Sequence, residues 1–339
     1  MNIREAVARL IDRVDLSEEE MTSVMNQIMS GEATASQVAS FLTALRMKGE
    51  TVQEITGAAR VMREKAHHIK VKSDCIIDTC GTGGDQKATF NISTTAAFVV
   101  AGAGVTVAKH GNRSVSSQSG SADVLAALGV KIDVPRERVR QCLEQIGIGF
   151  LFAPLLHEAM KYAVQPRREI GVRTIFNLLG PLTNPAGATH QLVGIYDGQL
   201  TSLIAQVLNN LGTLRAMVVH GVDGLDEISL CGPTDVSELR DGQVSHYTLL
   251  PEELGLKRCH LEDLHGGSPD ECAEALRAVL QGERGPKRDM VLLNSGAAFY
   301  ISGAAESIGQ GIGLAMDSID SGQAQKKLEL LIKMSHGGQ

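Results

Sequence analysis

Residues 75 to 94 read CIIDTCGTGGDQKATFNIST, an apolar run followed by a glycine-rich turn and the polar start of another apolar segment. The apolar run is typical of a short buried strand, and the segment after Asn91 is typical of a helix. Glycines at such a junction allow backbone N–H groups to converge on an anion. Neither common phosphate fingerprint fits: a G-x-G-x-x-G pattern from Gly81 requires glycine at Gln86, and Lys87 lacks the preceding glycine of a P-loop. The stretch therefore indicates either an anion site of another kind or a tight turn before a helix.

Strand-like and helix-like segments alternate on the C-terminal side of this stretch. The alternation predicts an α/β domain over residues 71–339 with a central, mostly parallel sheet. Ligands of such sheets bind at the carboxyl ends of the strands, which is where the glycine-rich turn lies. Besides CIIDTC, the predicted strands are VTVAKHG (105–111), QLVGIY (191–196), AMVVHG (216–221) and DMVLLNSG (289–296), and the predicted helices are TTAAFVVAGAG (94–104), SADVLAALG (121–129) and LTSLIAQVLNNLG (200–212).

Residues 1–70 predict a separate, small all-helical domain. Three pairs of residues have the spacing of a capping box ahead of apolar periodicity, and Gly31 fits a helix stop. Residues 151–185 also have a helical pattern without a clear strand, and we expect them to pack on this domain. The pairs are Ser17 with Glu20, Thr34 with Gln37, and Thr51 with Glu54.

The composition narrows the class of protein. A chain of 339 residues with 43% hydrophobic and 21% charged residues is typical of a soluble globular protein of roughly two domains. The net charge of −7 argues against nucleic acid as a partner, and no apolar run reaches the ~18 residues of a membrane span. The six cysteines form no C-x-x-C pair and no leader is recognised, so a cytoplasmic location is predicted. Cys80 lies in the glycine-rich turn, but no partner of a catalytic thiol is recognisable.

Two further polar segments follow predicted strands. KHGNRSVSSQSGS (109–121) combines cations with hydroxyls, which suits a polyphosphate, although solvated surface loops also have such compositions. His110 within it is either a packed polar residue or a catalytic base. HGVDGLDEIS (220–229) contains Asp226 and Glu227, whose oxygens suit Mg²⁺, although adjacent carboxylates are also common on plain surfaces. Together, the three segments predict a site for Mg²⁺ and a substrate that carries pyrophosphate.

The same segments resemble the anthranilate phosphoribosyltransferases of tryptophan biosynthesis. The resemblance is carried by DTCGTGGD (78–85), NIST (91–94), the KHGNRSVSS run and GLDEIS (224–229), and it extends to RTIFNLLGPLTNPA (173–186) and NSGAAFYISG (294–303). It implies an enzyme that transfers the phosphoribosyl group of phosphoribosyl pyrophosphate (PRPP) to the amine of anthranilate and releases pyrophosphate. It also implies Mg²⁺ as the cofactor, a nucleoside phosphorylase/phosphoribosyltransferase-like fold and a homodimer, although the apolar N-terminal helices could equally bury their faces within one chain.

The resemblance also implies roles for individual residues. Anthranilate would face Gly81, Asn112 and Arg167; Arg167 aligns without a gap, and Arg168 beside it is the other candidate. Catalysis would be mainly electrostatic, with Lys109 as the candidate residue. Mg²⁺ would be held by Ser93, Asp226 and Glu227. PRPP would be bound by Gly81, Gly84, Asp85, Thr89, Asn91, Ile92, Ser93, Thr94, Lys109, His110, Gly111, Asn112, Arg113, Ser114, Val115, Ser116, Ser117 and Ser121.

The sequence also allows a comparison with two other functions, those of a phosphorylase and of a nucleic-acid-binding protein. A pyrimidine nucleoside phosphorylase shares the architecture, but it uses inorganic phosphate, carries a lysine-serine-glycine-arginine type of loop in place of KHGNR, and has no matching D-E pair. A relative that binds nucleic acid without catalysis is expected to show basic stripes and eroded substrate loops. This chain is acidic overall and retains all three segments.

Overall fold

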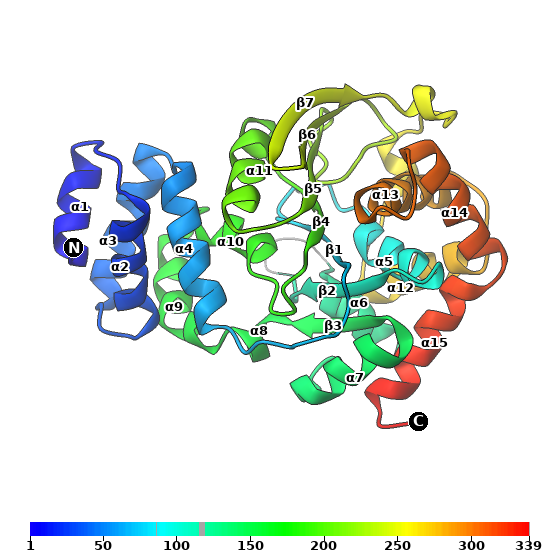
Figure 1. The fold of residues 1–339 in the computed structure, drawn as a ribbon, viewed down its shortest axis with the longest axis horizontal. Helices are drawn as coiled ribbons and strands as arrows, with labels where there is room; N and C mark the ends of the chain where they lie inside the picture. The colour runs from blue at the N-terminus through cyan, green and yellow to red at the C-terminus, as the bar shows by residue number, and fades with distance from the viewer. Residues whose placement is uncertain (86, 115–118, 339) are drawn as a thin grey trace.

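A computed structural model of the chain describes residues 1–85, 87–114 and 119–338. Figure 1 shows a small helical domain at one end, a sheet in the middle, and the C-terminal helices against the far side of the sheet. The expected combination of a small helical domain and a larger α/β domain is therefore confirmed. In the described part of the chain, no helix is both long and apolar enough to cross a membrane.

The helical domain begins with α1 (Ile3–Ile11), α2 (Glu18–Met29), α3 (Ala35–Lys48) and α4 (Val52–Lys65). The three predicted capping boxes are present at the starts of α2, α3 and α4, because each Ser or Thr side chain accepts from the backbone N–H three residues later. From later in the chain, α9 (Lys161–Ile170) packs on α2 and α3, and α10 (Phe176–Leu182) packs on α4.

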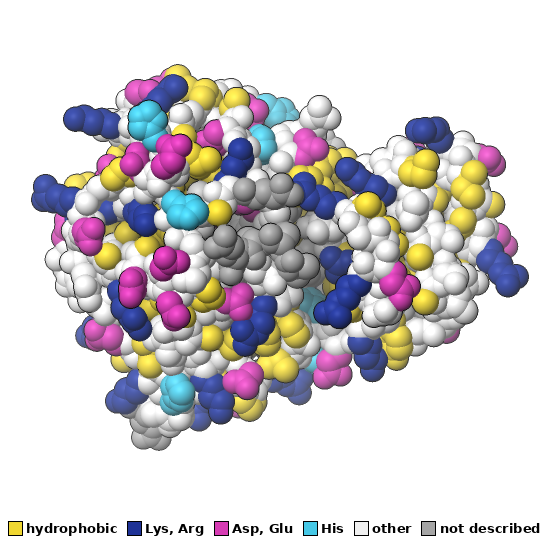
Figure 2. All heavy atoms as spheres, turned by 180° about the vertical axis from the view of Figure 1, so that it is seen from behind, with side chains coloured by type: hydrophobic (Ala, Val, Ile, Leu, Met, Phe, Trp, Pro, Cys, Tyr) yellow, Lys and Arg dark blue, Asp and Glu magenta, His cyan; other side chains and the backbone are white. Residues whose placement is uncertain are grey.

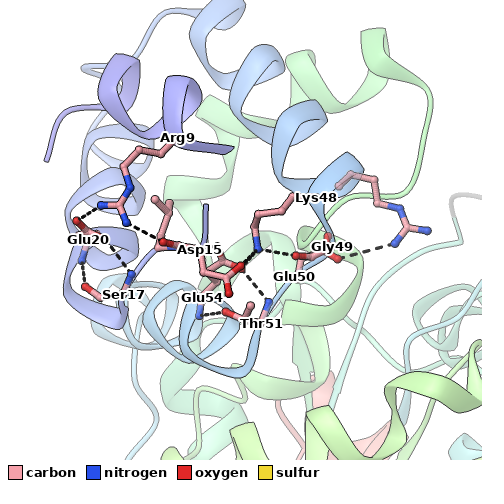
Figure 3. A network of polar contacts seen from close by, with 11 residues as sticks. Arg9, Asp15, Ser17, Glu20, Lys48, Gly49, Glu50, Thr51 and Glu54 are labelled. Atoms are coloured by element: carbon pink, nitrogen blue, oxygen red, sulfur yellow. Dashed lines mark hydrogen bonds and ion pairs between the residues drawn. The ribbon is translucent and has the colours of Figure 1, made fainter. Parts of the chain in front are cut away.

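One capping residue also anchors the helical domain from inside. Glu54 is fully buried, accepts from Leu16 N at 3.0 Å, and accepts from Lys48 Nζ at 2.9 Å (Figure 3). Lys48 Nζ also donates to Asp15 at 2.7 Å. A buried charge is tolerated when it is paired and hydrogen-bonded, so this network fixes the connection between α1 and α2 and the end of α3 against the start of α4.

The sheet has seven strands in the order β3-β2-β1-β4-β5-β6-β7. The pairs from β3 to β5 are parallel, and the pairs β5–β6 and β6–β7 are antiparallel, which confirms a mostly parallel sheet. The strands are β1 (Ile76–Gly81), β2 (Thr106–Gly111), β3 (Ile148–Phe152), β4 (His190–Gly194), β5 (Arg215–Gly221), β6 (Thr234–Arg240) and β7 (Gln243–Leu249).

Helices cover both faces of the sheet. One apolar core joins the sheet to α5 and to the C-terminal helices, and a second joins it to α11 and continues into the helical domain. A third, smaller core joins β1, β2 and β3 to α7 and α8. The helices of the α/β domain are α5 (Ile92–Gly102), α6 (Ser121–Ala127), α7 (Arg136–Ile146), α8 (Ala153–Leu156), α11 (Thr201–Asn210), α12 (Pro269–Leu280), α13 (Pro286–Ser302), α14 (Ile308–Asp320) and α15 (Gln323–Ser335).

The prediction of a strand at DMVLLNSG (289–296) is wrong, because this segment forms the middle of α13. The helix packs against α5 and α14 and is buried on most sides, so its sequence lacks a polar face. A short apolar run of this kind does not distinguish a buried strand from a buried helix by periodicity alone.

Three strands, β3, β6 and β7, were not predicted from the sequence. β3 is the short apolar run IGFLF beside a helical segment, and β6 and β7 form a hairpin at the edge of the sheet. Asp241 and Gly242 connect the hairpin with φ of 52° and 75°. An Asp-Gly pair is the preferred connection of a two-residue hairpin, so this signal was present in the sequence.

Candidate active site

The carboxyl ends of β1, β2, β4 and β5 lie at one edge of the sheet, since these neighbouring strands are parallel. Three segments leave this edge: the glycine-rich loop (residues 81–91), the cationic loop (109–121, beginning in the end of β2) and the acidic loop (222–231). The topology therefore brings the three predicted segments to one place.

The acidic loop folds back across the ends of β1 and β4. A Cβ at Gly194 would overlap the carbonyl oxygen of Asp226, and a Cβ at Gly81 would overlap its carboxylate oxygen Oδ2. Neither strand end could carry a side chain with the acidic loop in this position. The glycine at residue 81 is thus required by the neighbouring loop, in addition to any role with an anion.

The acidic pair, Asp226 and Glu227, contacts the glycine-rich loop and the start of α5. Gly83 N donates to Asp226 Oδ2 at 2.7 Å, and Ser93 N donates to Glu227 Oε1 at 3.1 Å. Burial raises the pKa of Asp226 to about 7, and the charge of Asp85 adds to the shift. Burial, followed by the charge of Asp226, raises the pKa of Glu227 to about 8. Ionisation of these buried carboxylates is therefore unfavourable unless a cation offsets their charge.

Lys109 lies in β2, beside β1, and only 4% of its surface is exposed. Its Nζ donates to the carbonyl of Thr79 at 2.6 Å and lies 3.4 Å from Ser93 Oγ. Burial lowers the pKa of Lys109, whereas the charges of Asp78 and Glu227 oppose the shift. This ammonium group is the buried cation of the site.

Asp78, a buried residue of β1, holds the end of the neighbouring strand β2. Its carboxylate accepts from His110 N at 3.2 Å and from Asn184 Nδ2 at 2.8 Å, and Asn184 also donates to the carbonyl of Ala108. Burial raises the pKa of Asp78 to about 6, and the charge of Lys109 opposes the shift. The interior of the sheet thus fixes the strand that carries Lys109.

Asp123 joins the two described ends of the cationic loop. Its carboxylate accepts from Ser114 N at 3.0 Å and from Gly120 N at 3.1 Å, and it pairs with Arg113 Nη1 at 2.7 Å. Arg113, expected to contact PRPP, is therefore engaged by Asp123. Ser121 Oγ donates to the carbonyl of Asn112 at 3.4 Å. Of the other predicted contacts, Val115, Ser116 and Ser117 lie outside the described residues.

Thr89 and Asn91 tie the end of the glycine-rich loop to other segments. Thr89 forms an isolated antiparallel bridge with His265. Asn91 Nδ2 donates to the carbonyl of Ser119 at 3.5 Å, and Ser119 Oγ donates to Asn91 Oδ1 at the same distance. Asn91 thus links the glycine-rich loop to the cationic loop.

The start of α5 presents backbone and hydroxyl groups to this site. The side chain of Ile92 is in the core at 1% exposure, so only its backbone can meet a ligand. Thr94 is also buried, and its hydroxyl has no hydrogen-bond partner in the described part of the chain. Ser93 lies between them, with its N–H on Glu227 and its hydroxyl near Lys109.

The buried histidine and cysteine side chains of this region are uncharged. The His110 ring packs on His157 with centroids 5.1 Å apart. Burial lowers the pKa of His110 to about 3 and that of His157 to about 4. Burial also raises the pKa of Cys80, and the charge of Asp78 adds to the shift, so the thiolate that a nucleophile requires is disfavoured.

The two candidate arginines on α9 have different surroundings. The guanidinium of Arg167 lies over the ring of Phe176, 5.2 Å from its centroid, and burial lowers the pKa of Arg167. Arg168 is exposed. In the described part of the chain, no hydrogen bond joins Arg167 to Asn112 or Gly81, although all three were expected around one ligand.

Asn294 and Arg173 contact the loops of the site and were not among the predicted site residues. Asn294 on α13 accepts from Ile228 N at 3.1 Å and donates to Ile228 O at 2.9 Å, so it fixes the residue next to Glu227. Arg173 donates from Nη2 to the carbonyl of Gly84 in the glycine-rich loop. For Asn294, the available signal in the sequence was a polar residue after the apolar run MVLL, whereas Arg173 stands in no comparable pattern.

Two models of the glycosyl transferase family match successive parts of the chain. The one described as "Glycosyl transferase family, helical bundle domain" matches residues 4–66. The one described as "Glycosyl transferase family, a/b domain" matches residues 73–325. The matched ranges correspond to the helical domain and to the part of the chain that builds the sheet.

Similar proteins correspond to this chain over nearly its whole length. The anthranilate phosphoribosyltransferase of Syntrophobacter fumaroxidans is 58% identical over 98% of this chain and 99% of the relative. The crystal structure of the Thermus thermophilus anthranilate phosphoribosyltransferase matches with a TM-score of 0.93 at 45% identity, over 98% of this chain and 99% of that chain. The Saccharomyces cerevisiae anthranilate phosphoribosyltransferase in complex with PRPP and Mg matches with a TM-score of 0.89 at 29% identity, over 98% of each chain. Both domains therefore have their counterparts in these relatives.

Proposed function

This chain belongs to the anthranilate phosphoribosyltransferase family, and we propose that its glycine-rich, cationic and acidic loops together form the site of the family's reaction. The enzyme transfers the phosphoribosyl group of PRPP to the amine of anthranilate. Pyrophosphate is released and N-(5-phosphoribosyl)anthranilate, an intermediate of tryptophan synthesis, is formed. The observation that carries our assignment of residues is the convergence of Lys109, Ser93 and the acidic pair at one edge of the sheet.

We assign PRPP to the space bordered by these loops. The backbone of the glycine-rich loop and the first turn of α5 offer N–H groups to phosphate oxygens. The cationic loop adds charge and polar groups from Lys109, Asn112 and its described serines. Figure 2 shows Lys and Arg side chains beside the junction of the two lobes, which suits a substrate with this much negative charge.

Mg²⁺ is the cofactor, and the acidic pair has the properties of its binding site. Asp226 and Glu227 are adjacent carboxylates with raised pKa values, and each accepts a backbone N–H. Within the described ranges, no three His, Cys, Asp or Glu side chains gather as a complete metal site. The Ser93 hydroxyl and phosphate oxygens of the substrate would supply further ligands, which is the usual mode for Mg²⁺. When bound, the ion neutralises charge on the pyrophosphate.

The residues of the site act mainly on the leaving group. The amine of anthranilate is neutral at pH 7 and needs little activation, whereas negative charge grows on pyrophosphate as its bond to the ribose breaks. The buried ammonium of Lys109 stabilises that charge more strongly than a solvated one would, because it lies in a low-dielectric site. His110 is neutral at pH 7 and so adds no charge. Electrostatic stabilisation of the leaving group therefore requires no pair of catalytic acid and base.

An assay of anthranilate consumption tests the proposed function directly. Anthranilate is fluorescent, so the wild-type chain with PRPP and Mg²⁺ should consume the signal directly. If the signal stayed constant and the chain instead split uridine or thymidine with inorganic phosphate, the assignment to PRPP would be wrong.

Arg167→Ala is expected to raise the KM for anthranilate about 10- to 100-fold, because a cation near an anionic substrate contributes about 1.5–3 kcal/mol. The KM for PRPP should change little. Arg168→Ala is the matched control, since this neighbouring side chain is exposed and should leave both constants within about twofold. The opposite result for the two variants would assign anthranilate to Arg168.

We propose that two copies associate through the outer end of the helical domain. Ile11 and Met47 are 68% and 71% exposed, and they lie in α1 and α3, which pack against each other. Tyr162 and Val164 of α9, which packs on α3, are also exposed. Figure 2 shows hydrophobic side chains on this outer side of the smaller lobe. An apolar surface of this kind fits a self-complementary interface.

Met47→Asp combined with Ile11→Asp is expected to convert a dimer into a monomer of 36.1 kDa, because two buried charges would be introduced on each side of the interface. Light scattering after size-exclusion chromatography measures the mass. Leu214→Asp, at an exposed apolar residue of the α/β domain, is the control and should leave the dimer intact. A wild-type chain that is already monomeric at micromolar concentration would contradict the proposal.

We also propose a reducing, cytoplasmic location. All six cysteines are free thiols, and the sulfurs of Cys231 and Cys259 lie only 3.7 Å apart without a bond. Such pairs tend to oxidise in secretory compartments. Alkylation of both thiols in intact cells, before lysis, is the measurement that tests this location.

A further inference from the structure

We propose that Arg173 is a positioning residue for PRPP: its guanidinium, stacked on Tyr196, holds the carbonyl of Gly84 and so sets the direction of the N–H groups of the glycine-rich loop. The proposal rests on the assignment of PRPP to this loop. Arg173 itself contacts the protein backbone, and we assign it no contact with the substrate.

The first observation is the contact between Arg173 and Gly84. Nη2 of Arg173 donates to the carbonyl of Gly84 from a segment 89 residues away in the sequence. Gly84 has a φ of +78°, and a Cβ there would lie 3.1 Å from the same Nη2 atom. A glycine is therefore needed both for the backbone conformation and for the close approach of the guanidinium.

The second observation is the ring that supports the guanidinium. Arg173 Cζ lies 4.0 Å from the centroid of the Tyr196 ring, well within the distance of a cation–π contact. Tyr196 follows β4, and its backbone N–H donates to Thr82 Oγ1 at 3.1 Å. Thr82 N in turn donates to the carbonyl of Gly194 at 2.9 Å. The segment Gly194–Tyr196 thus holds residue 82 directly and residue 84 through Arg173.

The third observation is a second contact in the same loop, between Gly83 and Asp226. Gly83 N donates to Asp226 Oδ2, while Gly84 O accepts from Arg173. The peptide units on either side of the one that joins Gly83 to Gly84 are therefore held, the first by an anion and the second by a cation. Two glycines with positive φ have no side chains to fix this conformation, so the rest of the structure must supply the constraint.

The position of this clamp suits a role at the domain junction. Burial raises the pKa of Tyr196. The charges of Arg46 and Arg173 oppose this shift, and the charge of Glu50 adds to it. Arg46 lies in α3 and Glu50 follows this helix, so the Tyr196 ring lies where the helical domain meets the glycine-rich loop. The clamp therefore joins the PRPP loop to the part of the α/β domain that faces the helical domain.

The prediction concerns how the kinetic effect divides between the substrates. Arg173→Ala should raise the KM for PRPP about 10- to 100-fold, because a charge-assisted hydrogen bond that orients the loop is lost. The KM for anthranilate should stay within about threefold, and kcat should fall less than the KM for PRPP rises. Calorimetric titration of PRPP with Mg²⁺, without anthranilate, should show the same weakening.

Matched variants separate positioning from a general loss of structure. Tyr196→Leu removes the ring and should reproduce the effect of Arg173→Ala, whereas Tyr196→Phe keeps the ring and should retain the wild-type KM for PRPP. Arg173→Lys keeps a donor and a cation and should recover part of the affinity. An unchanged KM for PRPP in Arg173→Ala, or equal losses for both substrates together with a lowered melting temperature, would overturn the proposal. Inactivity of the wild-type chain would instead refute the proposed function.

Discussion

Replacing Asp226 by Asn together with Glu227 by Gln is expected to reduce kcat about 10³-fold, the scale of an electrostatic contribution to a developing anion. The amides are isosteric and can still accept the N–H groups of Gly83 and Ser93. They cannot supply the negative charge that holds Mg²⁺. The fluorescence assay measures turnover, and calorimetry with Mg²⁺ and pyrophosphate measures the loss of ion binding.

The melting temperature of this double variant should be equal to or higher than that of the wild type without Mg²⁺. Folding raises the pKa values of Asp226 and Glu227, so ionised carboxylates at high pH oppose the folded state, and neutral amides remove that cost. Asp223→Asn in the same loop is the control, because its carboxylate already accepts from Leu225 N and Ser229 Oγ. The control should lose far less activity. Near-normal turnover in the double variant would exclude the acidic pair as the metal site.

Replacing Lys109 by Met is expected to reduce kcat about 10²- to 10³-fold, because the buried cation nearest the acidic pair is lost while the volume is nearly conserved. The carbonyl of Thr79 loses a donor as well. The affinity for PRPP should fall less than kcat, since other backbone and side-chain groups also bind the phosphates. Single-turnover measurements of anthranilate consumption separate the two effects.

This variant also removes the positive charge that opposes the raised pKa of the buried Asp78, so the folded state is expected to lose stability at pH values where Asp78 is ionised. The double variant Asp78→Asn with Lys109→Met removes both charges, and it should recover most of the thermal stability without recovering turnover. Recovery of turnover along with stability would show that Lys109 acts only through the fold. Activity of Lys109→Met within about threefold of wild type would exclude it from catalysis.

Local signals in the sequence predicted four of the seven strands and the starts of three helices of the helical domain correctly. The capping boxes at Ser17, Thr34 and Thr51 were found because such caps depend on residues three positions apart. The segment DMVLLNSG was assigned wrongly because α13 is surrounded by other helices, and this burial is not a local property. The hairpin of β6 and β7 was missed although its Asp-Gly turn was visible.

Some predicted site residues lie together at the edge of the sheet, whereas another is paired with a neighbouring side chain of the protein. The acidic pair, Ser93 and Lys109 lie together at the edge of the sheet, as their motifs suggested. Arg113 forms an ion pair with Asp123. No sequence pattern distinguished it from an arginine that is free to bind a phosphate. The partner of a long, charged side chain depends on which segments meet in three dimensions.

The sequence by itself determined the family, the order of the two domains and the types of residue at the site, because motifs such as GTGGD, KHGNR and LDE are read along the chain. The tertiary structure alone decided why Gly194 must be a glycine, that Asn294 holds the acidic loop, and that Arg173 reaches Gly84. It also decided that the pKa values of Asp226 and Glu227 are raised. Each of these properties depends on the distance between segments far apart in sequence and on the water excluded between them. Neither quantity is encoded at a fixed spacing along the chain.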